Sequence, residues 1–83
     1  MKNVLIYNQS ETNMEVLKIF LAQEGYQVYV VSRLEDVIRR VGQKDIHLVV
    51  MDIDFPQNDG VERLKEIRNT DRMPIIVLSA NDR

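Results

Sequence analysis

Polar residues that directly follow apolar runs are the candidates for chemistry in this 83-residue sequence. They are Asn8 with Gln9, Ser32, Asp52 with Asp54, and Ser79. Asp52 stands out, because a carboxylate at the end of an apolar run needs a solvated crevice or a partner. Two interpretations stay open at this point: a strand-end residue that caps the following loop, or a carboxylate with a functional role.

The elements that would position these residues alternate along the chain. Short apolar runs predict strands at residues 4–7, 27–31, 46–53 and 75–78. Between them, apolar residues recur at helical spacing in three segments. Strands that alternate with helices favour βαβ units and a parallel sheet with helices on its faces. Ligands bind such sheets at the carboxyl ends of the strands, which is where the polar residues fall.

Local signals predict where the first two helices begin and end. Thr12 with Glu15, and Ser32 with Glu35, have the spacing of a capping box. Gly25 follows the first helical segment and Gly42 follows the second, as helix stops.

Composition excludes several classes of function. With no cysteine, the chain has neither a disulfide framework nor a thiolate metal site. A net charge of −2 argues against nucleic-acid binding by this segment. No apolar run approaches the roughly 20 residues of a membrane span, so we expect a cytoplasmic protein without membrane contact. The single His47 has no second histidine to share a metal, and a structural or surface role is expected for it.

The sequence resembles the receiver domain of two-component response regulators. The resemblance lies in the first strand at residues 4–7, the run at 47–53 that contains Asp52, Pro56 with Asp59 and Gly60, and the segment 74–80. It implies a single truncated receiver-like domain over residues 1–83, with a flavodoxin-like α/β fold and strand order 2-1-3-4. The last helix, strand and helix of the family pattern have no counterpart in the sequence.

The resemblance also implies a function, which is signalling rather than catalysis. Asp52 would be the phosphoacceptor, served by a histidine kinase or a phosphotransfer protein, and Ser79 would be the switch hydroxyl. Mg²⁺ would be held by Asp52 and by the backbone carbonyl of Asp54. Asn81 would modulate the access of water.

Two departures from the family pattern bear on this chemistry. Asn8 and Gln9 stand where receivers carry an acidic pair, so we expect Mg²⁺ binding to be weak or absent. The lysine that contacts the phosphoryl group in the family has no counterpart. An alternative is therefore a pseudo-receiver that acts as a protein–protein interaction module without phosphorylation. A third hypothesis, a flavodoxin-like fragment that binds a small cofactor, has no specific support.

The expected strand order also has a consequence for association. Right-handed crossovers would place one helix on one face of the sheet and two on the other, which leaves part of an apolar face bare. The fourth strand, residues 75–78, would be an exposed apolar edge without proline or charge. We expect self-association, or a partner that covers this edge.

Overall fold

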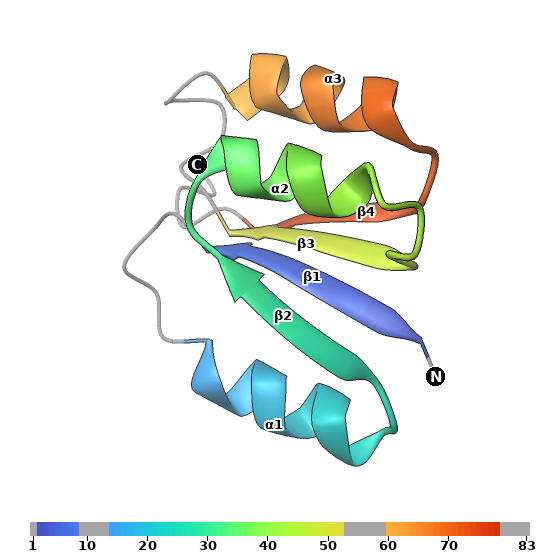
Figure 1. Ribbon diagram of the computed structural model, residues 1–83. Helices are drawn as coiled ribbons and strands as arrows, with labels where there is room; N and C mark the ends of the chain where they lie inside the picture. The colour runs from blue at the N-terminus through green and yellow to red at the C-terminus, as the bar shows by residue number, and fades with distance from the viewer. Residues whose placement is uncertain (1, 9–13, 53–59, 79–83) are drawn as a thin grey trace.

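The computed structural model of the chain describes residues 2–8, 14–52 and 60–78. Strands and helices alternate along the described chain (Figure 1). Their bounds are β1 Asn3–Asn8, α1 Glu15–Gln23, β2 Gln27–Val31, α2 Leu34–Val41, β3 Leu48–Asp52, α3 Gly60–Thr70 and β4 Ile75–Leu78. No helix within these ranges is long and apolar enough to cross a membrane.

The four strands form one parallel sheet in the order β2-β1-β3-β4. This is the parallel sheet and the strand order expected from the sequence. Helices α2 and α3 lie together on one face, and α1 lies on the other (Figure 1). All strands run the same way, so their carboxyl ends form one edge of the sheet, here called the carboxyl edge.

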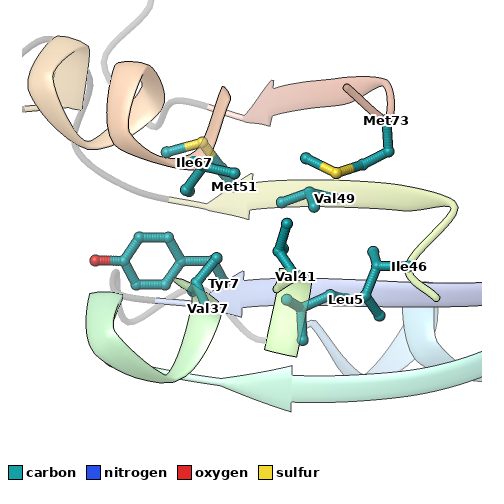
Figure 2. Packing of buried hydrophobic residues seen from close by; sticks show 9 residues of the cluster. All are labelled: Leu5, Tyr7, Val37, Val41, Ile46, Val49, Met51, Ile67 and Met73. Atoms are coloured by element: carbon teal, nitrogen blue, oxygen red, sulfur yellow. The ribbon is translucent and has the colours of Figure 1, made fainter. Parts of the chain in front are cut away.

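The larger core lies between the sheet and helices α2 and α3. Leu5 and Tyr7 of β1 and Met51 of β3 are fully buried there, since alternate residues of a strand point to the same face. Val37 from α2 and Ile67 from α3 pack against them (Figure 2). Each fully buried aliphatic side chain contributes about 1.5–3 kcal/mol relative to exposure. This layer therefore fixes α2 and α3 on the sheet.

The opposite face is covered less completely. Leu21 of α1 packs on Val4, Ile6 and Val50, which are the inward residues of β1 and β3 on that side. Ile76, from β4, remains 48% exposed and Leu78 remains 39% exposed. An apolar groove of about 200 Å³ lies over β3 and β4, lined by Leu17, Leu21, Leu48, Val50, Ile76 and Leu78. The expected bare strip of sheet is present in the described part of the chain.

The start of α2 differs from the sequence expectation, whereas the helix ends before Gly42 as predicted. Arg33, not Ser32, is the N-cap residue, and no side chain caps the helix, so the capping box predicted there is wrong. The Glu35 carboxylate instead accepts from the Arg33 guanidinium, and this contact lowers the pKa of Glu35. At the other end, Gly42 keeps a helical conformation and Lys44 takes the left-handed one, with φ of 66°.

The end of α1 agrees with the expectation. Gly25 has φ of +93°, a conformation that side chains with a Cβ rarely adopt. The predicted cap residue Thr12 lies outside the described residues, and Met14 occupies the N-cap position.

His47 has the structural role expected for it. Its Nδ1 accepts a hydrogen bond from the backbone N–H of Asn3 at 2.9 Å, and the backbone N–H of His47 donates to the carbonyl of Asn3 at 2.9 Å. The Asn3 amide donates to the carbonyl of Asp45, also at 2.9 Å. These bonds fix the register of β1 against β3 at the amino end of the sheet, and thereby the register at the carboxyl edge.

Candidate functional site

Asp52 and Asn8 lie side by side at the carboxyl edge. The register of β1 with β3 pairs Asn8 with Asp52, the last residue of each strand. Adjacent strands are about 4.8 Å apart, so the two side chains start from neighbouring backbones. Asp52 is only 3% exposed and Asn8 is half-buried. The fold therefore places a carboxylate and an amide together at the position where parallel sheets bind ligands.

The strand order also decides which other polar residues approach Asp52. Leu78 of β4 is paired with Asp52 on its other side, and Ser79 is the next residue in the sequence. Ser32 follows β2, which β1 separates from β3, so the fold does not bring Ser32 beside Asp52. Of the other residues singled out from the sequence, Gln9, Asp54, Ser79 and Asn81 lie outside the described residues.

A contact that sequence reasoning missed lies at the same edge. Tyr7 precedes Asn8 and its ring is fully buried among Val37, Met51 and Ile67. Its hydroxyl points toward the carboxyl edge (Figure 2). There it accepts a hydrogen bond of 3.4 Å from the guanidinium of Arg63, in the first turns of α3. A tyrosine at the end of an otherwise aliphatic strand was the available signal, since a buried hydroxyl needs a polar partner.

Burial and charge act in opposite directions on Tyr7. Desolvation of the ring raises the pKa of its hydroxyl above the ordinary value. The nearby positive charge of Arg63 and its hydrogen bond lower that pKa in part, and the negative charge of Glu35 raises it. Burial dominates, so Tyr7 stays neutral and serves as a hydrogen-bonding partner.

The donor set at the edge is compatible with Mg²⁺ but sparse. Mg²⁺ is bound through oxygen, commonly by one or two carboxylates together with substrate phosphate oxygens. Asp52 could offer one carboxylate, and Asn8, its partner in the strand register, could offer a neutral amide oxygen. Among the described residues, no group of three or more histidine, cysteine, aspartate or glutamate side chains could hold a metal. Such a site depends on oxygens that a phosphoryl group would bring.

Comparison with known proteins finds one family. The family model described as "Response regulator receiver domain" matches residues 4–83. Among curated proteins, the chain is 37% identical over 78 residues to response regulator RR06 of Streptococcus pneumoniae serotype 2. It is 32% identical over 82 residues to response regulator GtcR of Aneurinibacillus migulanus. These alignments cover 94% and 99% of this chain but 36% and 34% of the relatives, so the chain spans about a third of their length.

Solved structures share the fold. A chain in the crystal structure of histidine kinase ThkA in complex with response regulator protein TrrA superposes with a TM-score of 0.79 at 30% identity. The match covers 100% of this chain and 72% of that one. The receiver domain of NtrC4 from Aquifex aeolicus gives the same TM-score at 24% identity, covering 100% of this chain and 69% of that one.

Proposed function

The chain belongs to the response regulator receiver domain family, a family of non-enzymatic signalling modules, and on that premise we propose that it accepts a phosphoryl group on Asp52. The observation that carries the proposal is the placement of Asp52 at the carboxyl edge, in register with Asn8. An acceptor needs a carboxylate fixed by its surroundings, and Asp52 ends a strand that is hydrogen-bonded on both sides.

The proposed reaction transfers a phosphoryl group from a nucleophile of the donor to the carboxylate of Asp52. A carboxylate oxygen of Asp52 attacks the donor's phosphorus, and a new P–O bond forms as the donor's bond to phosphorus breaks. The electron pair of that bond leaves with the donor, as an imidazole from a phosphohistidine or as a carboxylate from an acyl phosphate. The product is an aspartyl phosphate on Asp52.

We further propose that Mg²⁺ assists this step and binds weakly without a phosphoryl group. Asp52 and the Asn8 amide would be ligands, with Gln9 and the backbone carbonyl of Asp54 as the remaining candidates. When bound, the ion would neutralise charge on the phosphoryl oxygens. Asn8 in place of a carboxylate supports weak binding, because a neutral amide attracts a hard dication less than an anionic oxygen does.

The remaining roles belong to residues that follow β4. We propose Ser79 as the hydroxyl that bonds the phosphoryl group and biases a two-state surface, and Asn81 as a residue that modulates water access. The pairing of Leu78 with Asp52 supports the assignment to Ser79, because Ser79 directly follows Leu78 in the sequence. The cytoplasm is the proposed location.

A histidine kinase or a phosphotransfer protein is the proposed donor. The response regulator protein TrrA is in complex with histidine kinase ThkA in the crystal structure that this chain matches, which supports this class of partner. The outer surface of α1 offers a second line of support. Val16 is 80% exposed there, and Ile19 and Phe20 are also exposed. Clustered apolar side chains in water mark a surface for association.

The second candidate function is an interaction module without phosphorylation. The groove over β3 and β4 favours it, together with Asn8 in place of an acidic residue. Within the described sheet, β4 pairs on one side only, so its other side presents unpaired backbone groups. We propose that a second copy or a partner segment covers this edge.

Intact mass after incubation with a small acyl phosphate and Mg²⁺ separates the two functions. We expect the chain to gain one phosphoryl group, and an Asp52→Asn variant to gain none. Asp36→Asn is the matched control, since it makes the same chemical change on the surface of α2 and is expected to react fully. No gain in a folded sample, or equal gain in both variants, would refute Asp52 as acceptor and leave the interaction module.

A further inference from the structure

A polar pocket lies at the opposite edge of the sheet from Asp52, between the turn after α2 and the turn after α3. Both turns are at the right of Figure 1. The pocket has a volume of about 450 Å³ and is lined by Lys44, Arg68, Asn69, Thr70, Asp71 and Arg72. It thus has three cations against one carboxylate, in a chain whose net charge is −2. The positive charge of the molecule is locally concentrated here.

Two of the three cations are held in place by backbone oxygens. The Lys44 ammonium donates to the carbonyl of Thr70, the last residue of α3. The Arg68 guanidinium donates to the carbonyl of Met73. Each group uses one donor in this way, and an ammonium has three donors while a guanidinium has five. Held cations with donors to spare lose little side-chain entropy when they bind an anion.

Further donors line the same pocket. Neither the Arg72 guanidinium nor the Asn69 side-chain amide makes a hydrogen bond or an ion pair with any residue the structure describes. Asp71, the one carboxylate, accepts from the backbone N–H of Arg72 at 2.8 Å, which offsets part of its charge. The pocket therefore has donors and cations in excess of its one carboxylate, and the Lys44 and Arg68 side chains occupy backbone carbonyls at the end of α3.

Lys44 itself adopts a conformation that costs free energy. Its φ of 66° lies in the left-handed region, where glycine or asparagine is the ordinary choice. The side chain explains a lysine at this position, because its ammonium donates to the carbonyl of Thr70 at the end of α3 and lines the pocket.

We propose that this pocket binds a phosphate-bearing small molecule through its phosphate groups. Arginine forks match phosphate oxygens in pairs, and lysine adds a point charge. The lining holds no aromatic side chain on which a base could stack, so recognition rests on the phosphates rather than on what they carry. The site is separate from the acceptor at Asp52 and does not depend on it.

Calorimetric titration with inorganic diphosphate, in buffer that contains a chelator, tests the proposal. We expect saturable binding, with changes in the backbone NMR signals of Lys44 and residues 69–72. Arg72→Gln should weaken the affinity about tenfold, as for the loss of one charge-assisted contact. Lys18→Gln on α1 removes the same charge far from the pocket, and Asp52→Asn alters the acceptor; both should bind as the unaltered chain does.

A nucleoside diphosphate serves as a second ligand, to determine whether the site recognises the phosphates alone or also the nucleoside. Equal affinity for both ligands supports recognition of the phosphates alone. Binding of the nucleoside form with markedly higher affinity contradicts that part of the proposal. Signal changes centred on Asn8 and Asp52, or equal small changes with chloride and sulfate at the same ionic strength, would overturn the site.

The Lys44→Gly variant tests the role of the Lys44 cation in a chain that is expected to stay folded. The substitution removes the cation and relieves the left-handed strain at the same time. We expect the melting temperature to stay within about 5 °C of the unaltered chain, and the affinity for diphosphate to fall about tenfold. Lys44→Arg should retain binding. A Lys44→Gly variant that is folded and binds diphosphate normally would contradict the role of this cation.

Discussion

Arg63 donates a hydrogen bond of 3.4 Å to the hydroxyl of Tyr7, and this contact joins the first turns of α3 to the end of β1. The two residues are separated by 56 positions in the sequence. Tyr7 adjoins Asn8, and Asn8 is paired with Asp52. The contact therefore ties a helix on one face of the sheet to the strand end beside the proposed acceptor.

Tyr7→Phe should reduce the loss of stability at alkaline pH. The pKa of Tyr7 is raised by burial in the folded state, so its contribution is complete below the unfolded pKa of about 10. That contribution is lost as the pH rises through the higher folded value. Urea unfolding at neutral and alkaline pH should show a steeper loss for the unaltered chain than for Tyr7→Phe. Tyr26→Phe, at a half-exposed tyrosine, is the control, and equal slopes for all three proteins would contradict the prediction.

Asn8→Asp should strengthen Mg²⁺ binding. The new carboxylate would lie in register with Asp52, which gives the dication a second anionic ligand. We expect a gain in affinity on the order of tenfold, together with lower stability without metal because like charges then face each other. Titration of backbone NMR signals with Mg²⁺ measures the affinity, and urea unfolding without metal measures the stability. Asn69→Asp adds the same charge at the other edge and should not change the affinity at Asp52; equal gains would argue against the site.

Ile67→Val should destabilise the fold modestly. Ile67 is fully buried between α3 and the sheet, and loss of one methylene there costs about 0.5–1.5 kcal/mol in the free energy of unfolding. Ile19→Val makes the same change on α1, where the side chain is half exposed, and should cost less than about 0.5 kcal/mol. Urea titrations of the two variants give the comparison. A larger loss of stability for Ile19→Val than for Ile67→Val would contradict the assignment of Ile67 to the core.

Ile76→Lys should weaken self-association. Ile76 lines the groove over β3 and β4, and a charge on an open strand opposes pairing with another chain. Sedimentation velocity at several micromolar concentrations should show a shift toward monomer. Val30→Lys, on the edge strand at the other side of the sheet, is the matched control and should behave as the unaltered chain. An unaltered chain that is monomeric throughout and melts cooperatively would refute association through β4.

The order and type of the elements could be read from the sequence because each depends on local patterns. The strands at residues 27–31 and 75–78 have the predicted bounds, and Gly25 adopts the left-handed conformation predicted for a helix stop. The apolar run at 46–53 is longer than the strand, which spans Leu48–Asp52 within the described residues. Of the first residues of the run, Ile46 packs in the core and His47 accepts a hydrogen bond from the backbone of Asn3.

The errors and omissions share a physical cause. The spacing of Ser32 to Glu35 predicts a capping role for Ser32, but the Glu35 carboxylate accepts hydrogen bonds from the guanidinium of Arg33 instead. Lys44 reaches a carbonyl 26 residues away, and Arg63 reaches Tyr7 across the fold. Contacts of side chains distant in sequence depend on the packing of helices, which periodicity does not specify. The placement of Asp52 beside Asn8 was predictable only through the strand order 2-1-3-4, which the resemblance to receiver domains implies.

The position of β1 in the sheet determines when the chain can fold during synthesis. β1 is made before β2 and β3 but lies between them in the sheet, so its pairing is incomplete until Asp52 has been added. Every strand pair is parallel and needs a helical crossover, so no pair forms as a local hairpin. Sheets built from such distant contacts fold more slowly than those built from local ones. During synthesis, the buried residues of β1 therefore lack part of their native neighbours until β3 has emerged from the ribosome.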